Sequence, residues 1–339
     1  MTDPASSPFA DIRELIASAP DLDADARDAA QSRVAGLVQS RGSLGRLEDL
    51  AVWLASWQGL SPPQINQPMA VIFAGSHGVA RHNVAADPPE TTPKIVDLLR
   101  KGDAATNHIT AAAGAALRVF EMALEQATPD ITQAPAMSEA ECAATIAFGM
   151  EAVAEKPDLL ALGELGVGGG TTAAAVACGL FGGDAGYWVR AGNWVTPDVL
   201  ARRVEAVETA LQTHRGHMSD PLEVMRRLGG RELAAMVGAI VAARHQRIPV
   251  VLDGFATCVA AAIVQAVSPG GADHCLAGHL SAEPAHQALL DRLGKDPLLS
   301  LDLRHCEAAG SSLAIPILKA ACDVAANTAQ SSDLNWTRL

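Results

Sequence analysis

The sequence predicts an α/β protein with a mostly parallel sheet flanked by helices and a small helical domain. Short apolar runs that end in glycine alternate with helical patterns through most of the 339 residues, and this alternation is typical of βαβ units. Hydrophobic residues make up 49% of the chain, but aromatic residues only 4%. Its core is therefore built mainly from alanine, leucine and valine, which favours alanine-rich helices packed closely on a sheet.

The first 60 residues carry helical patterns and no strand signal. Apolar residues recur at helical spacing from Asp11 to Val38, where a proline divides the stretch into two helices, and again from Leu47 to Trp57. We therefore expect a small helical domain over residues 1–60, joined by a C-terminal helix over residues 311–330. A larger domain is expected over residues 61–310.

The strand signals begin at residue 68. Four buried strands are expected over residues 68–74, 159–162, 248–253 and 275–278, and a further one over residues 117–123 after an alanine-rich helix over residues 102–117. Ligands of open parallel sheets bind at the carboxyl ends of the strands, so Ser76 and His77 stand where chemistry can occur. A hydrogen-bonded turn histidine is the commoner role for a lone residue such as His77.

A glycine-rich turn follows the short apolar strand that begins at residue 159. It holds one carboxylate, Glu164, and leads into a helix that opens on two threonines; its candidate ligand-binding residues are Gly166, Gly168, Gly169, Gly170, Thr171 and Thr172. Glycine lets the backbone approach a ligand, and the helix N-terminus suits a phosphate. The turn lacks the lysine of a Walker A loop and the third glycine of a dinucleotide fingerprint. A sugar phosphate is therefore favoured over NAD, although a purely structural tight turn remains open.

Two further candidates stand on helices or at their starts. Glu307 lies at a junction between a loop and a helix, where it is either a charge at a helix N-terminus or a general base. Arg203 lies on a helix after the glycine-rich turn and either meets a phosphate or is solvated on an exposed face.

Charge and cysteine usage exclude several partners. A net charge of −13 disfavours binding to nucleic acid or to an anionic membrane. The six cysteines form no C-x-x-C pair and the histidines no metal-binding spacing, so we expect neither disulfides nor a metal, and no cofactor. The N-terminus has no secretory signal pattern, and a cytoplasmic location follows.

Several stretches together resemble one enzyme family. They are residues 42–48, 73–79, 135–138, 163–168, 171–172, 220–224, 249–255, 278–283, 301–304, Glu307 and 314–318. In this order they resemble the nicotinate-nucleotide:dimethylbenzimidazole phosphoribosyltransferases over roughly residues 10 to 325. The resemblance implies a Rossmann-like sheet with a small helical domain, and a homodimer.

The resemblance also implies a reaction and roles for residues. Phosphoribose moves from nicotinate mononucleotide to 5,6-dimethylbenzimidazole or a related aromatic base, which yields the α-ribazole phosphate of the cobalamin lower ligand. Glu307 matches the family's general base, Arg203 its phosphate-binding lysine, and Glu164 with the glycine turn its nucleotide site. Ser76, His77 and Lys94 fall in the base pocket.

Departures from the family pattern keep a second hypothesis open. Three glycines precede Thr171 where the family has Gly-Asn, and Cys306-Glu307-Ala308-Ala309-Gly310 stands where it has Gly-Glu-Gly-x-Gly. The added methyl groups lie where backbone approaches a ligand. The alternative is a catalytically impaired paralogue that binds nucleotide or base, or a partner subunit of an active homologue. A third hypothesis, that the chain is a dinucleotide-dependent oxidoreductase, is supported by the glycine turn alone.

Overall fold

The computed structural model describes residues 7–40, 42–190 and 195–334. Its main sheet has five parallel strands in the order β2-β1-β3-β4-β5. The strands are β1 (Pro68–Ala74), β2 (Ala116–Glu121), β3 (Leu159–Leu165), β4 (Val250–Leu252) and β5 (Cys275–Ala277), and a separate parallel pair joins β6 (His279–Leu280) to β7 (Leu299–Ser300). The order reverses between β1 and β3, which is where open parallel sheets bind ligands.

Helices connect the strands along the chain. They are α1 (Pro8–Ala17), α2 (Ala24–Gly36), α3 (Arg46–Gln58), α4 (Thr91–Lys101), α5 (Ala105–Ala112), α6 (Glu139–Gly149), α7 (Gly169–Phe181), α8 (Ala185–Trp188), α9 (Pro197–Thr213), α10 (Pro221–Leu228), α11 (Arg231–His245), α12 (Phe255–Val267), α13 (Pro284–Leu293) and α14 (Ala309–Asn327), with short 3-10 turns at Gly78–His82 and Met150–Val153.

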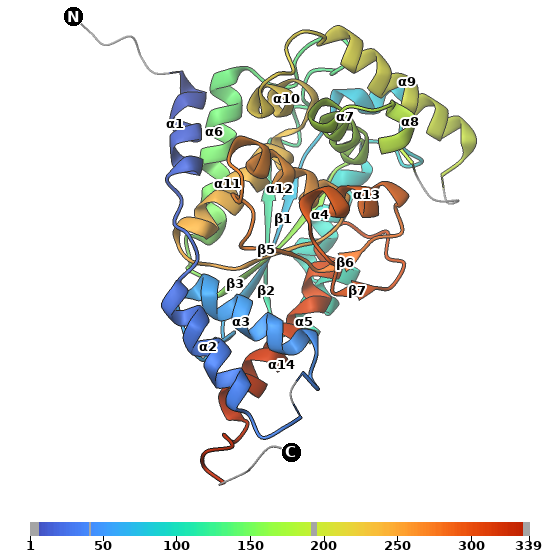
Figure 1. Cartoon of the computed structure of the whole chain (residues 1–339). Helices are drawn as coiled ribbons and strands as arrows, with labels where there is room; N and C mark the ends of the chain where they lie inside the picture. The colour runs from blue at the N-terminus through green and yellow to red at the C-terminus, as the bar shows by residue number, and fades with distance from the viewer. Residues whose placement is uncertain (1–6, 41, 191–194, 335–339) are drawn as a thin grey trace, which may run out of the picture.

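Both faces of the sheet are covered, because every residue of β1 and β3 is buried. Alternate side chains enter opposite cores: Val71 and Phe73 pack with α7, α11 and α12, whereas Ala70 and Ile72 pack with α3, α4 and α14. The chain therefore forms three layers, with the sheet in the middle, as Figure 1 shows. Strands buried on both faces explain the continuous apolar runs of the sequence.

The N-terminal helices divide between the two sides of the sheet. Helices α2 and α3 pack on each other and on α14, whereas α1 packs on α6 and α12 (Figure 1). Helix α14 also contacts β1, β3 and β4. The division into a helical unit of residues 1–60 with 311–330 and a unit of residues 61–310 stays a proposal.

Helix α14 is the one helix of the described chain that is long and apolar enough to cross a membrane, by length and composition. Its most apolar window is 56% buried inside the protein, and its apolar side chains Ile315 and Leu318 are fully buried. The packing against the sheet accounts for this apolar character, since a core helix of a layered fold needs the same composition.

The expected elements agree with the structure except at a few places. The helix expected over residues 102–117 ends at Ala112, and β2 starts at Ala116. Gly114 turns the chain with a φ of +63°, which glycine adopts without strain, and pairing with β1 draws the following residues into the sheet. The glycines of residues 182–197 favour a loop, but the structure has the short helix α8 within this stretch.

Candidate active site

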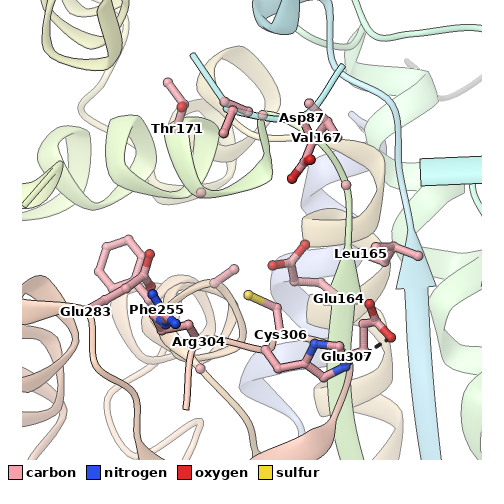
Figure 2. Close-up of a pocket in the computed structure, with 18 of the residues that line it drawn as sticks. Asp87, Glu164, Leu165, Val167, Thr171, Phe255, Glu283, Arg304, Cys306 and Glu307 are labelled. Atoms are coloured by element: carbon pink, nitrogen blue, oxygen red, sulfur yellow. Dashed lines mark ion pairs between the residues drawn. The ribbon is translucent and has the colours of Figure 1, made fainter. Parts of the chain in front are cut away.

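A cavity of about 900 Å³ opens at the carboxyl end of β3. Its wall combines the glycine turn before α7, the segment before α4, the start of α9, the start of α12 and the loop before α14. Figure 2 shows side chains from these segments facing one another across the cavity. Among the expected site residues, those that line it are Glu164, Gly166, Gly168, Gly170, Thr171, Arg203 and Glu307.

The glycine turn is shaped by close contacts below it. A Cβ at Gly166 would lie 2.7 Å from the carbonyl oxygen of Gly75 and 3.0 Å from His77 Nε2, so the strand ends of β1 and β3 meet too closely for a side chain. Gly168 has a φ of +99° and is the N-cap residue of α7. The turn therefore needs glycine at residue 166 for space and at residue 168 for backbone conformation.

Thr171 presents a free hydroxyl at the N-terminus of α7. Its side chain is 1% exposed and lines the cavity, and its Oγ1 has no hydrogen-bond partner among the described residues. Thr172 does not line the cavity, because its Oγ1 donates to the carbonyl oxygen of Gly169 within the helix (2.9 Å). A buried unpartnered hydroxyl at the positive end of a helix dipole is suited to an anion.

Glu164 lies at the cavity floor, close to the first turn of α7. It is 5% exposed, and its Oε2 has no hydrogen-bond partner among the described residues. Burial, and next the nearby carboxylate of Glu232, raise its pKa to about 8. The carboxyl group is therefore largely protonated at neutral pH, when it is able to donate a hydrogen bond to a ligand.

Glu307 reaches the same cavity from the loop before α14. Its backbone neighbour Cys306 accepts a hydrogen bond from the N–H of Glu164 (3.1 Å), which joins the loop to β3. The Glu307 side chain is 7% exposed, and its Oε2 lies 3.3 Å from His305 Nε2 and accepts from Thr106 Oγ1 at 3.4 Å. The carboxylate is thus held by polar partners inside a largely enclosed site.

The alanines that follow Glu307 do not block the cavity. Ala308 is fully buried and Ala309 is 1% exposed, and neither lines the cavity wall. The Ala308 methyl packs in the core formed with α3 and α14. Ala308 has a φ of +60°, a conformation that costs a non-glycine residue about 1 to 2 kcal/mol. The departure from glycine therefore adds backbone strain without filling the pocket.

Arg203 extends from α9 to the cavity. Its Nε donates to the carbonyl oxygen of Val84, and burial lowers its pKa while Glu283 opposes that change. Glu283 lines the cavity as well, and burial raises its pKa. Because arginine remains charged in proteins, the Arg203 guanidinium is able to bind a phosphate on the side of the cavity near α13.

The remaining expected residues do not line this cavity. Ser76 Oγ donates to the carbonyl oxygen of Leu124 (2.9 Å), and Lys94 is exposed on α4. His77 is 4% exposed, and its Nε2 lies 3.5 Å from Glu232 Oε1 beneath the glycine turn. Gly169 starts α7, where an added Cβ would lie 3.1 Å from Glu164 Oε2. The assignment of Ser76, His77 and Lys94 to a base pocket stays a prediction.

Other residues that line the cavity were not among the site residues expected from the sequence. They are Ala85, Asp87, Phe255, Glu283, Asp302, Arg304, His305 and Cys306, several of which appear in Figure 2. A signal does exist for several of them: Phe255, Glu283 and Arg304 fall inside stretches that carry the family resemblance, and residues 302–306 immediately precede Glu307. Within the described residues, no group of three or more His, Cys, Asp or Glu side chains is arranged to hold a metal ion.

The fold and the cavity are those expected of a phosphoribosyltransferase. A family model described as a phosphoribosyltransferase matches residues 19–334 of the chain. The nicotinate-nucleotide–dimethylbenzimidazole phosphoribosyltransferases of Brucella anthropi and Rhizobium meliloti are each 51% identical to this chain over 314 residues, which is 93% of either length. The enzyme of that name from Methylocella silvestris is 53% identical over 316 residues. The chain belongs to this family of nicotinate-nucleotide–dimethylbenzimidazole phosphoribosyltransferases.

The solved structures agree. A crystal structure with this enzyme name from Thermus thermophilus matches with a TM-score of 0.86 and 34% identity, covering 94% of this chain and all of the other. The fold class and the family resemblance expected from the sequence are thereby confirmed, as is the enzyme class.

Proposed function

We propose that the cavity transfers the phosphoribosyl group of nicotinate mononucleotide to 5,6-dimethylbenzimidazole or a related aromatic base, with Glu307 as the general base. As a member of its family the chain is a phosphoribosyltransferase that forms α-ribazole phosphate. The observation that carries the role of Glu307 is its position: a nearly buried carboxylate in the cavity that also holds Thr171 and Arg203.

The donor phosphate is assigned to the glycine turn. The free hydroxyl of Thr171, the N-terminal end of α7 with its positive dipole, and the side chain of Arg203 all border the same space. The chain carries a net charge of −13, so a phosphate needs this local positive potential to remain bound. Protonated Glu164 adds no negative charge there and is able to donate to a ribose or base oxygen.

The chemistry follows from the two nitrogen heterocycles. The bond between the ribose C1′ and the nicotinate ring nitrogen breaks, and its electron pair returns to a ring that leaves as a neutral pyridine. One ring nitrogen of the acceptor forms the new bond to C1′, which makes the acceptor cationic and the N–H on its other nitrogen acidic. Glu307 accepts that proton, and a carboxylate shielded from water suits this task.

The test is turnover by the purified protein. Incubation with nicotinate mononucleotide and 5,6-dimethylbenzimidazole should release nicotinate and form ribazole phosphate in equal amounts, measured by chromatography. Glu307→Gln should lower kcat by at least about 100-fold, the range for loss of a general base. Glu125→Gln is the matched control, because Glu125 is exposed and does not line the cavity.

Unchanged turnover in Glu307→Gln would remove the assigned base. Binding of nicotinate mononucleotide by calorimetry without any turnover in the parent protein would instead favour the impaired paralogue. In that case co-expression with an active homologue tests whether the chain serves as a partner subunit.

The family resemblance supports a homodimer in the cytoplasm. Strand β2 lies at the edge of the sheet and each of its residues is exposed or half-buried, and the nearby Leu98 of α4 and Phe148 of α6 are each 44% exposed. Such apolar side chains are suited to burial between two subunits. All six cysteines are free, as a reducing compartment requires. Light scattering after size exclusion should give twice the chain mass of 35.0 kDa.

A further inference from the structure

His305 contacts the nearly buried carboxylate of Glu307 and is itself far more exposed. Its Nε2 lies 3.3 Å from Glu307 Oε2 and 3.2 Å from Thr106 Oγ1. The imidazole is 40% exposed, whereas the Glu307 side chain is 7% exposed and Thr106 is fully buried. One ring nitrogen therefore contacts the buried acid, while the exposed part of the same ring opens on the cavity, whose wall His305 also lines.

A base in a closed pocket needs a route for the proton that it removes. The Glu307 side chain is only 7% exposed, so a proton on it has little direct contact with water. Transfer from a carboxylic acid to a neutral imidazole is downhill by about two pKa units from ordinary values. Thr106 and His305 both contact Glu307, but Thr106 is fully buried, so His305 is the one of the two that water in the open cavity reaches.

We propose that His305 is a positioning residue for this reaction, which orients Glu307 together with Thr106 and passes its proton to water. The inference rests on the proposed function, since it requires Glu307 to act as the base. The acceptor N–H bond breaks and leaves its electron pair on the ring, the proton moves to Glu307 Oε2, and then to His305 Nε2. Water takes the proton from the imidazolium, which restores the neutral ring for the next turnover.

The charges around His305 set its pH dependence. The hydrogen bond to Glu307 raises the pKa of His305, burial opposes this, and the carboxylates of Glu307 and Asp253 raise it further. Asp253 lies at the end of β4, the neutral Thr106 lies on α5, and Arg304 precedes His305 in its own loop. The relay needs a neutral imidazole, so kcat should fall as the pH drops through a value above the ordinary pKa of histidine.

The experiment compares His305→Gln with the parent enzyme and with His108→Gln. His108 is the control because it is an exposed histidine on α5, the helix that carries Thr106. For His305→Gln at neutral pH we expect kcat to fall about tenfold, with both KM values within about twofold of the parent. Added imidazole should restore part of kcat, and the acid limb of the pH profile should move to lower pH. His108→Gln should match the parent enzyme.

Each result bears on a different claim. If the parent protein is inactive, the proposed function itself is refuted. If the parent is active and His305→Gln has unchanged kcat and pH profile, only the relay is refuted. A lower kcat that imidazole does not restore, with the acid limb unmoved, also overturns the relay. If His305→Gln fails to fold, the parent pH profile decides: an acid limb above the carboxyl range supports the relay, and a flat kcat from about pH 5 to 8 refutes it.

Discussion

Gly163→Ala should displace the catalytic base by steric conflict. Gly163 lies in β3, one residue before Glu164, and its α-carbon faces the loop before α14. An alanine Cβ would lie 2.1 Å from the backbone nitrogen of Ala308 and 2.7 Å from its α-carbon. Both contacts are with backbone, so no side-chain rotation relieves them. The residue that must move is joined directly to Glu307.

The structure gives the size of the effect. Ordinary van der Waals contact begins at 3.4 Å, so the two backbones must separate by about 1.3 Å, a shift typical of an overpacked core. Overpacking of this kind costs about 3 kcal/mol in the free energy of unfolding. A catalytic group misplaced by about 1 Å loses about 100-fold in rate. We expect both losses in Gly163→Ala.

The assay separates stability from position. Urea unfolding followed by circular dichroism gives the free energy of unfolding, and kcat is measured where each variant is fully folded. Gly238→Ala is the matched control: its Cβ would lie 1.9 Å from the carbonyl oxygen of Ile146, between α11 and α6 and away from the cavity. It should lose comparable stability and keep its kcat. Gly186→Ala, with nothing within 4 Å of the added carbon, should keep both.

Parental kcat in folded Gly163→Ala would refute the reasoning, because it would mean that Glu307 is not held by this contact or is not the base. Equal losses of kcat in Gly163→Ala and Gly238→Ala would also refute it, since general loosening of the fold would then explain both.

Two further predictions concern charges in the cavity. Arg203→Met should raise KM for nicotinate mononucleotide at least about tenfold, because it removes the cation from the phosphate site. The control is Arg202→Met, which should leave KM within about twofold, since Arg202 does not line the cavity. KM is measured from initial rates, and equal values for the two variants would remove Arg203 from the phosphate site. In the folded protein the pKa of Glu164 rises from the ordinary 4.5 to about 8, so the folded state binds this proton more tightly than the unfolded state. The protonated carboxyl therefore stabilises the fold below about pH 4.5, and this contribution is lost as the pH rises towards about 8. Glu164→Gln has no such proton, and its urea midpoint should depend less on pH in that window than the parent's; parallel pH curves would contradict this.

Local pattern predicted most elements because the sheet is buried on both faces. Continuous apolar runs such as Pro68–Ala74 and Leu159–Leu165 become strands, and glycines end them. Local pattern failed around residue 114, where alanine favours helix but pairing of β2 with β1 decides the structure. Helix α8 has only four residues, which is too short for a periodic signal.

Some residues of the site could likewise be predicted from local sequence, and others could not. Glu164 and Thr171 could be predicted because they flank one glycine-rich turn, at the end of a strand and the start of a helix. His305 could not, since its relation to Glu307 depends on how the loop before α14 bends towards Thr106 of α5. The cavity wall likewise includes Glu283 and Phe255, which lie far from the glycine turn in sequence.

The sequence by itself determined the alternation of strands and helices, the glycine turn and the family, because these depend on local periodicity and on motifs that keep their order. Only the tertiary structure decided which carboxylates share a cavity and which of them carry a proton. Parallel strands bring their carboxyl ends to one edge of the sheet whatever their separation in the chain. The pKa of Glu164 near 8 then follows from burial beside Glu232, which is a property of the packed fold.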